Sequence, residues 1–445
     1  MFSKILIANR GEIALRIIRS ARELGLKTVA VYSESDKNSL HSMLADEKIC
    51  IGPGKASESY LNIPTLLSVA EITKADAIHP GYGFLAENAR FQETCETSGI
   101  TFIGPRASDL KLMGDKNNAR LEMKKAKLPV IPGSDKIVED LPEAKKISLK
   151  IGYPIILKAT AGGGGKGMRI VNIPSQLENQ FRIAQNEARA AFGNPSLYIE
   201  KYIPDARHIE IQIVGDKKGN VIALGERECS IQRKHQKVLE ETPSPFIDEK
   251  LRRKIIKSVK EAAQFIGYQS LGTFEFLVDK RKKFYFMEAN TRVQVEHPIT
   301  EMVYGIDLIK EQIKIAEGEP VSLNSNFELR GHSIECRINA EDPNTFIPSS
   351  GKIEFLVLPG GEGIRVDTAA YCGWNIPPDY DSLIAKIIAL APSREECIKK
   401  MRTALEMSTI VGVKTNIPLH LNILSDSDFV NGNYNIEFME KFLSK

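Results

Sequence analysis

A glycine-rich segment between two apolar runs is the feature that most limits how this chain can fold. Five of the eight residues at 161–168 (AGGGGKGM) are glycine, and residues 154–159 and 168–171 are predicted strands on either side. Neither a helix nor a strand interior favours this composition, because each glycine loses extra conformational entropy on folding. The segment therefore predicts a hairpin loop whose backbone N–H groups, with Lys166, can surround phosphate oxygens. A plain surface turn is the alternative.

This loop differs from the Walker A phosphate loop, because no Gly-Lys-Ser/Thr sequence opens a helix here. Lys158, at the end of the preceding strand, is the natural fixed charge for a bound phosphate. A lysine at the end of a strand is usually only solvated, but this one precedes the glycine loop. Phosphate binding is therefore the favoured hypothesis.

The first part of the chain alternates predicted strands and helices, which is typical of a doubly wound α/β domain. We expect this domain to span residues 1–113. Its dinucleotide-binding version is excluded, because NRGEIA follows the first strand in place of GxGxxG. The expected strands are 4–8, 28–32, 77–79 and 100–103, and the expected helices are 13–24, 63–73 and 87–98.

Three further parts follow the N-terminal domain. Residues 114–131 are expected to form a helical connector. Residues 132–203 form a second module, which holds the glycine loop and a long helix at 176–191. Residues 204–445 are richer in short alternating strands and hairpins, without an internal repeat. The predicted fold class is therefore α/β and α+β.

The composition argues against several classes of protein. Lys and Arg total 60 and Asp and Glu total 57, so the net charge of the 445 residues is only +3. This balance argues against a broad basic surface for nucleic acid. The six cysteines form no CxxC pair, and we find neither a signal peptide nor a long apolar span. We expect a cytoplasmic protein with no membrane or nucleic-acid partner.

Two predicted strands near the middle of the chain carry acidic residues among aromatic ones. Residues 271–277 (LGTFEFL) and 284–290 (FYFMEAN) flank a polar turn. Side chains alternate along a strand, so Glu275 faces away from its phenylalanine neighbours, whereas Glu288 and Asn290 share a face. These oxygen-bearing side chains can converge as ligands for Mg²⁺. An ordinary half-exposed hairpin is the alternative.

The next segment, 291–300 (TRVQVEHPIT), combines a cation, an amide and a carboxylate. If it continues as a strand, Arg292, Gln294 and Glu296 lie on one side, next to the acidic face of the preceding strand. Such a group can form a pocket for a small anion beside a base. His297 has the opposite parity and is expected to serve packing.

Residues 227–241 (RECSIQRKHQKVLEE) are dense in hydrogen-bond donors. A solvated charged surface is the usual explanation of such a run. Strands predicted at 209–214 and 221–224 instead make it a loop that can fold over a polyanion. Arg337 lies in mid-strand between apolar neighbours, where it needs solvent or a charged partner, because burying an unpaired charge is costly.

Eight segments together resemble the biotin carboxylase subunit of biotin-dependent carboxylases, in the ATP-grasp superfamily. They occur in the family's order, cover essentially the whole chain and are long enough to make chance similarity unimportant. The segments are IANRGEIALR (7–16), HPGYGFLAEN (79–88), GPRASDLKLMGDK (104–116), AGGGGKGM (161–168), ECSIQRKHQKVLEE (228–241), EANTRVQVEHPITE (288–301), ECRINAEDP (335–343) and YDSLIAK (380–386).

The resemblance implies roles for individual residues. The residues matched to ATP binding are Lys116, Lys158, Gly163, Gly164, Gly165, Lys166, Gly167, Glu200, Lys201, Ile203, His208, Gln232, His235, Glu275 and Glu288. Those matched to metal binding are Glu275, Glu288 and Asn290. Those matched to bicarbonate are Lys237, Arg292, Gln294 and Val295, with Glu296 as general base and Arg337 facing the biotin ring.

The resemblance also implies an ATP-grasp fold and a reaction. Residues 132–203 would be a mobile lid over ATP, and residues 204–445 the body with the C-terminal domain. ATP and bicarbonate would give carboxyphosphate, with two Mg²⁺ or Mn²⁺ ions, and biotin would then be carboxylated. The expected parent enzyme is an acetyl-CoA carboxylase of fatty-acid synthesis, and the alternative is a pyruvate or other acyl-CoA carboxylase.

The implied partners are a biotin carboxyl carrier protein, carboxyltransferase subunits and a second copy of the chain. No biotinyl sequence is present, so biotin is expected to arrive on another protein. Arg19, Glu23 and Arg365 match positions of a family homodimer, whereas Glu362 replaces a phenylalanine of a relative. The competing hypotheses are a different ATP-grasp ligase and a regulatory protein that responds to nucleotide. The RKHQK and VQVEHP motifs argue against the first, and the retained acidic and basic residues against the second.

Overall fold

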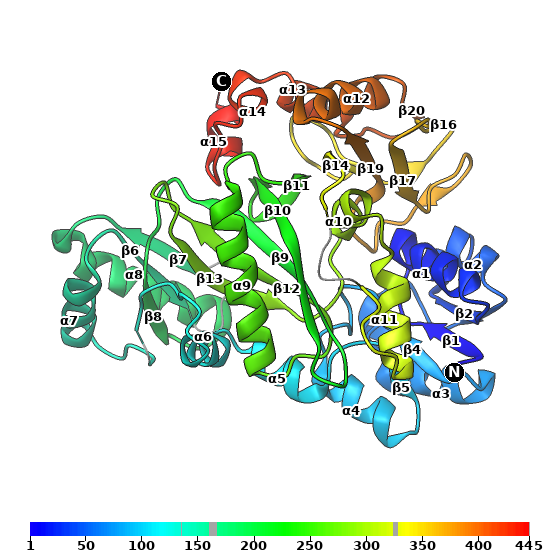
Figure 1. Cartoon of the computed structure of the whole chain (residues 1–445), viewed down its shortest axis with the longest axis horizontal. Helices are drawn as coiled ribbons and strands as arrows, with labels where there is room; N and C mark the ends of the chain where they lie inside the picture. The colour runs from blue at the N-terminus through cyan, green and yellow to red at the C-terminus, as the bar shows by residue number, and fades with distance from the viewer. Residues whose placement is uncertain (135, 160–166, 324–327, 445) are drawn as a thin grey trace.

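The computed structural model describes residues 1–134, 136–159, 167–323 and 328–444. Figure 1 shows the N-terminal domain on the right, the module that holds the glycine loop on the left, and a large sheet between them, with the C-terminal helices above. Gly163, Gly164, Gly165 and Lys166, predicted to contact phosphate, lie outside the described residues.

The N-terminal domain is built on a parallel sheet of five strands in the order β3-β2-β1-β4-β5. The strand order reverses on the two sides of β1, as in doubly wound folds, which confirms the expected α/β architecture. The strands are β1 (Lys4–Ile7), β2 (Lys27–Tyr32), β3 (Glu47–Cys50), β4 (Ala77–His79) and β5 (Thr101–Phe102). The helices are α1 (Gly11–Glu23), α2 (Leu40–Leu44), α3 (Ile63–Thr73), α4 (Ala89–Thr97) and α5 (Ala107–Gly114), with short 3-10 turns η1 (Glu34–Asp36) and η2 (Ala56–Glu58).

The next part is a small antiparallel sheet in the order β7-β6-β8, covered by two helices. Lys158 of β6 lies opposite Met168 of β7, and the Ala159 N–H donates to the Gly167 carbonyl at 2.9 Å, so the glycine segment does join the two strands of a hairpin. The elements are α6 (Lys116–Lys125), α7 (Leu141–Ile151), β6 (Ile155–Ala159), β7 (Met168–Val171), η3 (Pro174–Gln176), α8 (Leu177–Phe192) and β8 (Leu197–Lys201).

The body is an antiparallel sheet of eight strands, in the order β13-β12-β9-β10-β11-β14-β19-β17. Helix α9 (Glu249–Phe265) covers one face of it, where isoleucines of β9 pack against Ile255 and Val259. The strands are β9 (Arg207–Gly215), β10 (Val221–Arg233), β11 (Gln236–Thr242), β12 (Ser270–Val278), β13 (Phe284–Asn290), β14 (His332–Asn339), β17 (Ile364–Thr368) and β19 (Leu383–Ala391).

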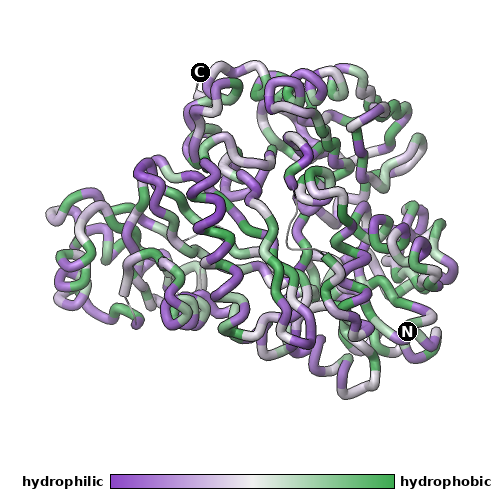
Figure 2. The backbone as a smooth tube through the Cα atoms, viewed as in Figure 1, coloured by the Kyte–Doolittle hydropathy of each residue, from purple (hydrophilic) through white to green (hydrophobic). Residues whose placement is uncertain are grey.

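Side-chain alternation along β9 determines which face of this sheet carries the charged groups. Ile209, Ile211 and Ile213 belong to the apolar cluster under α9. His208 and Glu210 therefore point to the opposite face, because successive side chains of a strand alternate. Figure 2 shows the corresponding contrast between the apolar inner strands and the polar outer helices.

Helices α10 and α11 connect the body to the N-terminal domain, and the C-terminal helices complete the upper part of the molecule in Figure 1. Apolar residues of α1, such as Ile13 and Ile17, share one core with Val303 and Leu308. The remaining elements are α10 (His297–Tyr304), α11 (Leu308–Glu317), β15 (Gly351–Lys352), β16 (Phe355–Val357), β18 (Asn375–Ile376), α12 (Arg394–Glu406), β20 (Thr409–Val411), α13 (Ile417–Ile423), α14 (Ser427–Val430) and α15 (Phe438–Leu443).

The prediction of a loop at 227–241 was wrong. Strands β10 and β11 occupy this segment and pair with each other, and only Lys234 and His235 form the turn between them, both with positive φ (48° and 64°). Its charged residues indicated a solvated loop. They occur in strands because several of them face oppositely charged side chains in a buried site, where each charge has a partner.

The segment 291–300 does not continue as a strand, so the condition for placing Arg292, Gln294 and Glu296 on one side by alternation is not met. Strand β13 ends at Asn290, and α10 begins at His297 with a proline in its first turn. Proline suits the first turn of a helix, because the missing N–H has no partner there anyway. Between the two elements the chain turns, and the His297 N–H donates to the Gln294 carbonyl at 3.3 Å.

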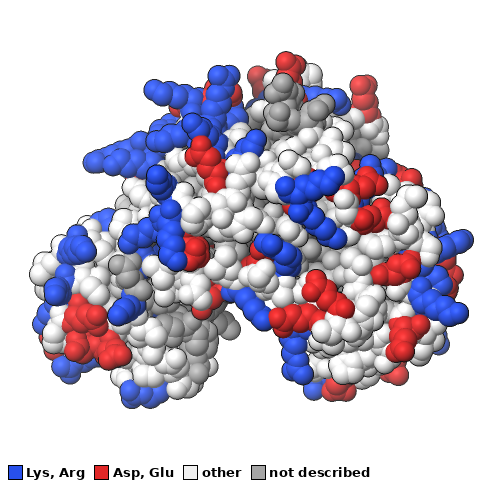
Figure 3. Space-filling model, turned by 60° about the horizontal axis from the view of Figure 1, so that its bottom comes forward, with Lys and Arg blue, Asp and Glu red and all other residues white. Residues whose placement is uncertain are grey.

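Positive charge is gathered on one part of the surface. Residues 248–283, which include α9 and the β12–β13 turn, hold ten Lys and Arg but five Asp and Glu, and Figure 3 shows Lys and Arg crowded at the upper left of that view. Near-neutrality of the whole sequence therefore does not exclude a local basic face. None of the helices that the structure describes has the length and apolarity needed to cross a bilayer.

Candidate active site

A buried group of charged side chains lies on the face of the large sheet opposite α9. Lys237 of β11 is at its centre, and its Nζ lies 2.5 Å from Glu210 Oε2, 3.0 Å from Glu275 Oε1 and 2.5 Å from Glu296 Oε1. The three carboxylates come from β9, β12 and the turn before α10, so three separate segments meet at one ammonium. The sequence patterns gave no role to Glu210.

The charged side chains in this group shift one another's pKa values. Burial alone lowers the pKa of Lys237, but the carboxylates around it raise that pKa well above its ordinary value. Burial alone raises the pKa of Glu296, but Lys237 and Arg337 hold it well below its ordinary value. Glu296 is therefore ionised at neutral pH and can accept a proton, as a general base must.

Arg337 of β14 lies on the other side of Glu296. Its Nε donates to Glu240 Oε1 at 2.6 Å, and its Nη2 donates to Glu296 Oε2 at 3.0 Å. The partner that a mid-strand arginine needs is thus a pair of buried carboxylates. Glu296 consequently contacts a cation with each of its two oxygens.

The oxygen-bearing side chains of β12 and β13 lie next to this group. Glu275 and Glu288 are directly opposite across the two strands, and Asn290 Nδ2 donates to Glu275 Oε1 at 2.8 Å. His208 Nε2 lies 3.0 Å from Glu275 Oε2, and Lys116 Nζ lies 2.5 Å from Glu288 Oε2. Two carboxylates and an amide oxygen suit Mg²⁺, which takes few protein oxygens and binds phosphate as well. Lys116 and His208, both predicted to contact phosphate, lie beside them.

The turn before α10 brings the predicted anion-binding residues to the same place, although it is not a strand. Gln294 Nε2 donates to Glu275 Oε1 at 2.9 Å, so its amide lies beside Lys237. Arg292 Nε donates to Glu87 Oε2 at 2.9 Å, and its Nη2 donates to Asn290 Oδ1 at 2.8 Å. Glu87 belongs to the N-terminal domain, which therefore helps to place Arg292.

Behind this turn lies Arg227 of β10, which is fully buried. Its Nη2 donates to Gln294 Oε1 at 2.7 Å and its Nη1 to Gln212 Oε1 at 2.9 Å. It also pairs with Glu210. Arg227 thus fixes which end of the Gln294 amide faces the site. The sequence around Arg227 is rich in donors, but nothing in it distinguishes this arginine from its neighbours.

The residues predicted to contact the nucleotide are divided between the glycine-loop module and the body. Lys158 is paired with Glu200, and Lys201 Nζ donates to the Tyr153 carbonyl at 2.8 Å. Gln232 Nε2 lies 2.6 Å from His208 Nδ1. Ile203 is buried, Gly167 has a φ of 73°, and His235 is exposed at the β10–β11 turn, outside the buried group.

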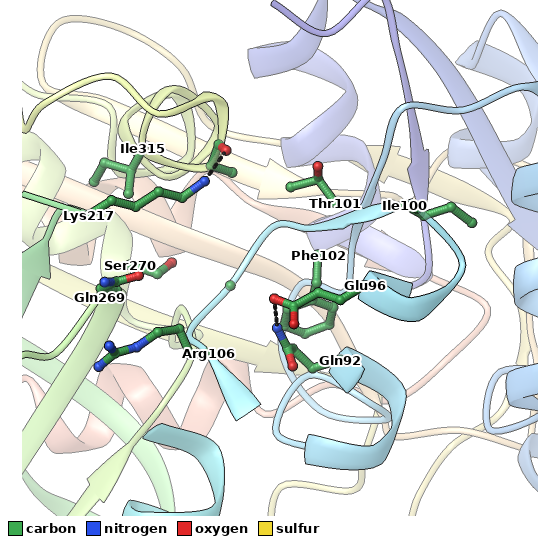
Figure 4. A pocket seen from close by; sticks show the side chains of 13 residues that line it. Gln92, Glu96, Ile100, Thr101, Phe102, Arg106, Lys217, Gln269, Ser270 and Ile315 are labelled. Carbon is green, nitrogen blue, oxygen red and sulfur yellow. Dashed lines mark hydrogen bonds between the residues drawn. The ribbon is translucent and has the colours of Figure 1, made fainter. Parts of the chain in front are cut away.

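A separate cavity of about 400 Å³ lies where α4 and β5 approach the start of β12 and the end of α11 (Figure 4). Gln92 Nε2 donates to Glu96 Oε1 at 2.5 Å on one side, and Lys217 Nζ donates to the Ala316 carbonyl at 3.0 Å on the other. Gly104 and Arg106 of the GPRASDLKLMGDK segment line this cavity, but none of the described residues that were given a role in the site does, so the charged group on the sheet is the better candidate for chemistry.

Known proteins match this chain over nearly its whole length. Residues 1–110 match "Biotin carboxylase, N-terminal domain", residues 115–324 match "Carbamoyl-phosphate synthase L chain, ATP binding domain", and residues 335–441 match "Biotin carboxylase C-terminal domain". Biotin carboxylase 1 of Bacillus subtilis is 54% identical over 445 residues, which cover 99% of each chain.

Two further relatives belong to other carboxylases. A pyruvate carboxylase subunit of Methanothermobacter thermautotrophicus is 52% identical over 99% of this chain and 90% of its own. The biotin carboxylase domain dimer of Hydrogenobacter thermophilus 2-oxoglutarate carboxylase, solved with MgADP, ADP and bicarbonate, is 50% identical. It superposes with a TM-score of 0.92 over 99% of this chain and 98% of that one.

Proposed function

Because the chain belongs to the biotin carboxylase family of ATP-dependent ligases, we propose that it carboxylates biotin on a separate carrier protein for an acetyl-CoA carboxylase. This would be the first half-reaction of malonyl-CoA synthesis. The observation that carries the proposal is the ionised Glu296 between Lys237 and Arg337. The match to 99% of a protein named biotin carboxylase 1 supports the proposal, and the match to 90% of a pyruvate carboxylase subunit keeps that parent enzyme as second candidate.

In the first step, bicarbonate binds beside Lys237, Arg292, Gln294 and the backbone of Val295. Glu296 removes the bicarbonate proton as a bicarbonate oxygen attacks the γ-phosphorus of ATP. The new O–P bond forms while the bond to the ADP oxygen breaks, which gives carboxyphosphate and ADP. Lys237 lies where it can neutralise charge that builds up on the transferring group.

The phosphates of ATP need further positive charge. Lys116, Lys158 and His208 hold them, together with the glycine loop. Glu275, Glu288 and Asn290 would hold Mg²⁺, and the ion would screen the phosphate oxygens from the incoming anion. Lys116 pairs with Glu288 of the proposed metal site, and Lys158 pairs with Glu200 of the neighbouring strand β8.

In the second step, carboxyphosphate breaks down to CO₂ and phosphate. The phosphate takes the N1′ proton of biotin, and N1′ attacks CO₂. Arg337 stabilises the negative oxygen of the biotin enolate while Glu240 keeps the guanidinium in place. Closure of the lid, residues 132–203, would exclude water, which otherwise hydrolyses the intermediate.

We also propose that the protein acts in the cytoplasm as a homodimer with a biotin carrier and carboxyltransferase subunits. A dimer of the Hydrogenobacter relative supports the oligomeric state. The side chains of Arg19 and Glu23 are about half exposed, with exposed fractions of 51% each, which fits a role between chains. All three residues also pair within their own chain, Arg19 with Asp367 at 3.7 Å, Glu23 with Lys310 at 2.5 Å and Arg365 with Glu301 at 2.7 Å.

The test is to measure ADP release by the purified protein with and without bicarbonate and biotin. We expect release to need both substrates, and labelled bicarbonate to enter biotin or a biotinylated carrier. Turnover that ignores biotin and depends on an amino acid or a purine precursor would contradict the proposal. Adding the carboxyltransferase that co-purifies with the chain, with acetyl-CoA or pyruvate as acceptor, then identifies the parent enzyme.

A further inference from the structure

A buried lysine lies directly behind the turn that carries the proposed base. Lys386 ends the YDSLIAK motif in β19, and its side chain has no exposed surface. Its Nζ donates to the Val295 carbonyl at 2.9 Å and lies 3.1 Å from Glu12 Oε1 and 4.0 Å from Asp367 Oδ2. The reaction described above gives this lysine no role.

The neighbours of Lys386 come from four parts of the fold. Glu12 belongs to α1 of the N-terminal domain, Asp367 to β17 and Val295 to the turn before α10. Within the sheet, Lys386 is the direct cross-strand partner of Arg337 on one side and of Asp367 on the other. Lys386 therefore lies next to Arg337 in the sheet, and its ammonium contacts the turn that carries Glu296.

A buried ammonium is a costly way to join elements that apolar packing could also join. Its hydrogen bond to a backbone carbonyl has a more specific effect. The peptide group is planar, so fixing the Val295 carbonyl also fixes the N–H of Glu296 and the direction in which the Glu296 side chain starts. The preceding carbonyl is fixed too, because His297 Nδ1 lies 2.8 Å from the Gln294 oxygen.

We propose that Lys386 is a positioning residue, which holds the Val295–Glu296 peptide so that the Glu296 carboxylate stays between Lys237 and Arg337. This role rests on the proposed function of Glu296. Lys386 has its partners among the described residues in Val295, Glu12 and Asp367, and none of these is assigned to the nucleotide. Its loss should thus affect the bicarbonate step and leave ATP binding intact.

The experiment compares three variants with the wild-type enzyme. Lys386→Met removes the ammonium and leaves the buried Glu12 with the Tyr82 hydroxyl as a partner but without a cation, which can unfold the protein. The double variant Lys386→Met/Glu12→Gln removes both charges. Glu12→Gln alone keeps the Lys386–Val295 hydrogen bond and removes only the ion pair. Thermal unfolding, kcat, and the KM values for bicarbonate and ATP are measured for each.

We expect the double variant to fold, to lose about a hundredfold in kcat as a base displaced by about 1 Å would, and to show a raised bicarbonate KM with an unchanged ATP KM. Glu12→Gln should retain most of the rate. The matched control is Arg252→Met, which removes a cation paired with Glu226 at 2.8 Å on the α9 side of the sheet and should change neither KM.

Two results would overturn the positioning role. One is a double variant that folds and turns over at the wild-type rate. The other is a Glu12→Gln variant as slow as the double variant, because then the ion pair and not the bond to Val295 would matter. Failure of the wild-type protein to carboxylate biotin would instead contradict the proposed function, so the two failures are distinguishable.

Discussion

Glu296 Oε2 accepts a hydrogen bond from Arg337 Nη2 at 3.0 Å, while its other oxygen lies 2.5 Å from Lys237 Nζ. The proposed base and the residue proposed to face biotin are therefore in direct contact. A carboxylate has about four acceptor sites on its two oxygens, so Glu296 can still accept the bicarbonate proton while it contacts both cations. Arg337 has a second carboxylate partner in Glu240, whose Oε1 accepts from Arg337 Nε at 2.6 Å.

Replacing Arg337 by alanine should act on both residues of this pair. Biotin carboxylation should fall severely, because the enolate oxygen loses its cation. Arg337 also helps to lower the pKa of Glu296, so its removal raises that pKa. The acidic limb of the residual rate should move to higher pH, since less of the base is ionised there. A near-normal rate, or an unshifted limb, would contradict the assignment.

Glu296→Gln tests the base itself. The loss of one general base typically costs about 100- to 10,000-fold in rate, and we expect a loss in that range for bicarbonate-dependent ADP release. The fold should survive, because Gln keeps the shape of the side chain. Glu261→Gln, an exposed change on α9, is the control and should have the wild-type rate. A Glu296→Gln enzyme with a near-normal rate would exclude a base role.

Lys237→Gln should show whether Lys237 acts on bicarbonate or on ATP. Lys237 touches Glu210, Glu275 and Glu296, and none of these partners belongs to the residues assigned to the lid. Bicarbonate-dependent turnover should therefore fall much more than ATP binding, measured as the dissociation constant of ATP. Lys257→Gln on the exposed side of α9 serves as the control. A variant that changes only the KM for ATP would show that Lys237 belongs to the nucleotide site.

The parts of the site that sequence patterns could predict are those built from regular alternation. Alternation predicts the two strands that carry Glu275 and Glu288, but a register shift between Glu275 and Phe276 sets their pairing, because without it Glu275 would lie opposite Met287. The strands around the glycine loop were predictable for the same reason. The alternation at 291–296 was misleading, however, because a turn that ends in the N-terminus of α10 happens to repeat polar and apolar residues.

The parts that could not be predicted are buried charges in strands. Glu210, Arg227 and Lys386 look like solvent-facing positions in the sequence, since charged residues are rarely buried. Their partners are distant in sequence. Arg227 pairs with Glu210 in the neighbouring strand, and Lys386 with Glu12 in another domain. Only the folded structure shows that each charge has a partner.

Replacing Glu288 by glutamine should weaken the proposed metal site. The variant keeps an oxygen but loses a negative charge opposite Glu275. We expect the Mg²⁺ concentration for half-maximal activity to rise about 10- to 100-fold or more, since even partners outside the first coordination sphere affect metal binding by that amount. The activity is titrated with Mg²⁺ at saturating ATP. An unchanged half-maximal concentration would exclude Glu288 as a ligand.

Acid stability should depend on a buried carboxylate that joins the body to the C-terminal helices. Glu241 Oε2 lies 2.6 Å from His332 Nε2 and 2.7 Å from Arg394 Nε. Burial alone would raise the pKa of Glu241, but the hydrogen bond from His332 and the charge of Arg394 lower it from 4.5 to about 2. At pH values above the ordinary pKa of a glutamate, this lowered pKa stabilises the fold by about 3 kcal/mol.

This stabilisation should disappear as the pH falls from 4.5 towards 2, where Glu241 becomes protonated. Glu241→Gln should therefore unfold at a lower temperature than the wild type at neutral pH, and the difference between them should shrink as the pH is lowered through that range. Thermal unfolding across the pH series measures both effects. Glu396→Gln, an exposed change on α12, should stay close to the wild type throughout. A difference for Glu241→Gln that does not vary with pH would show that its carboxylate is not the source of the stability.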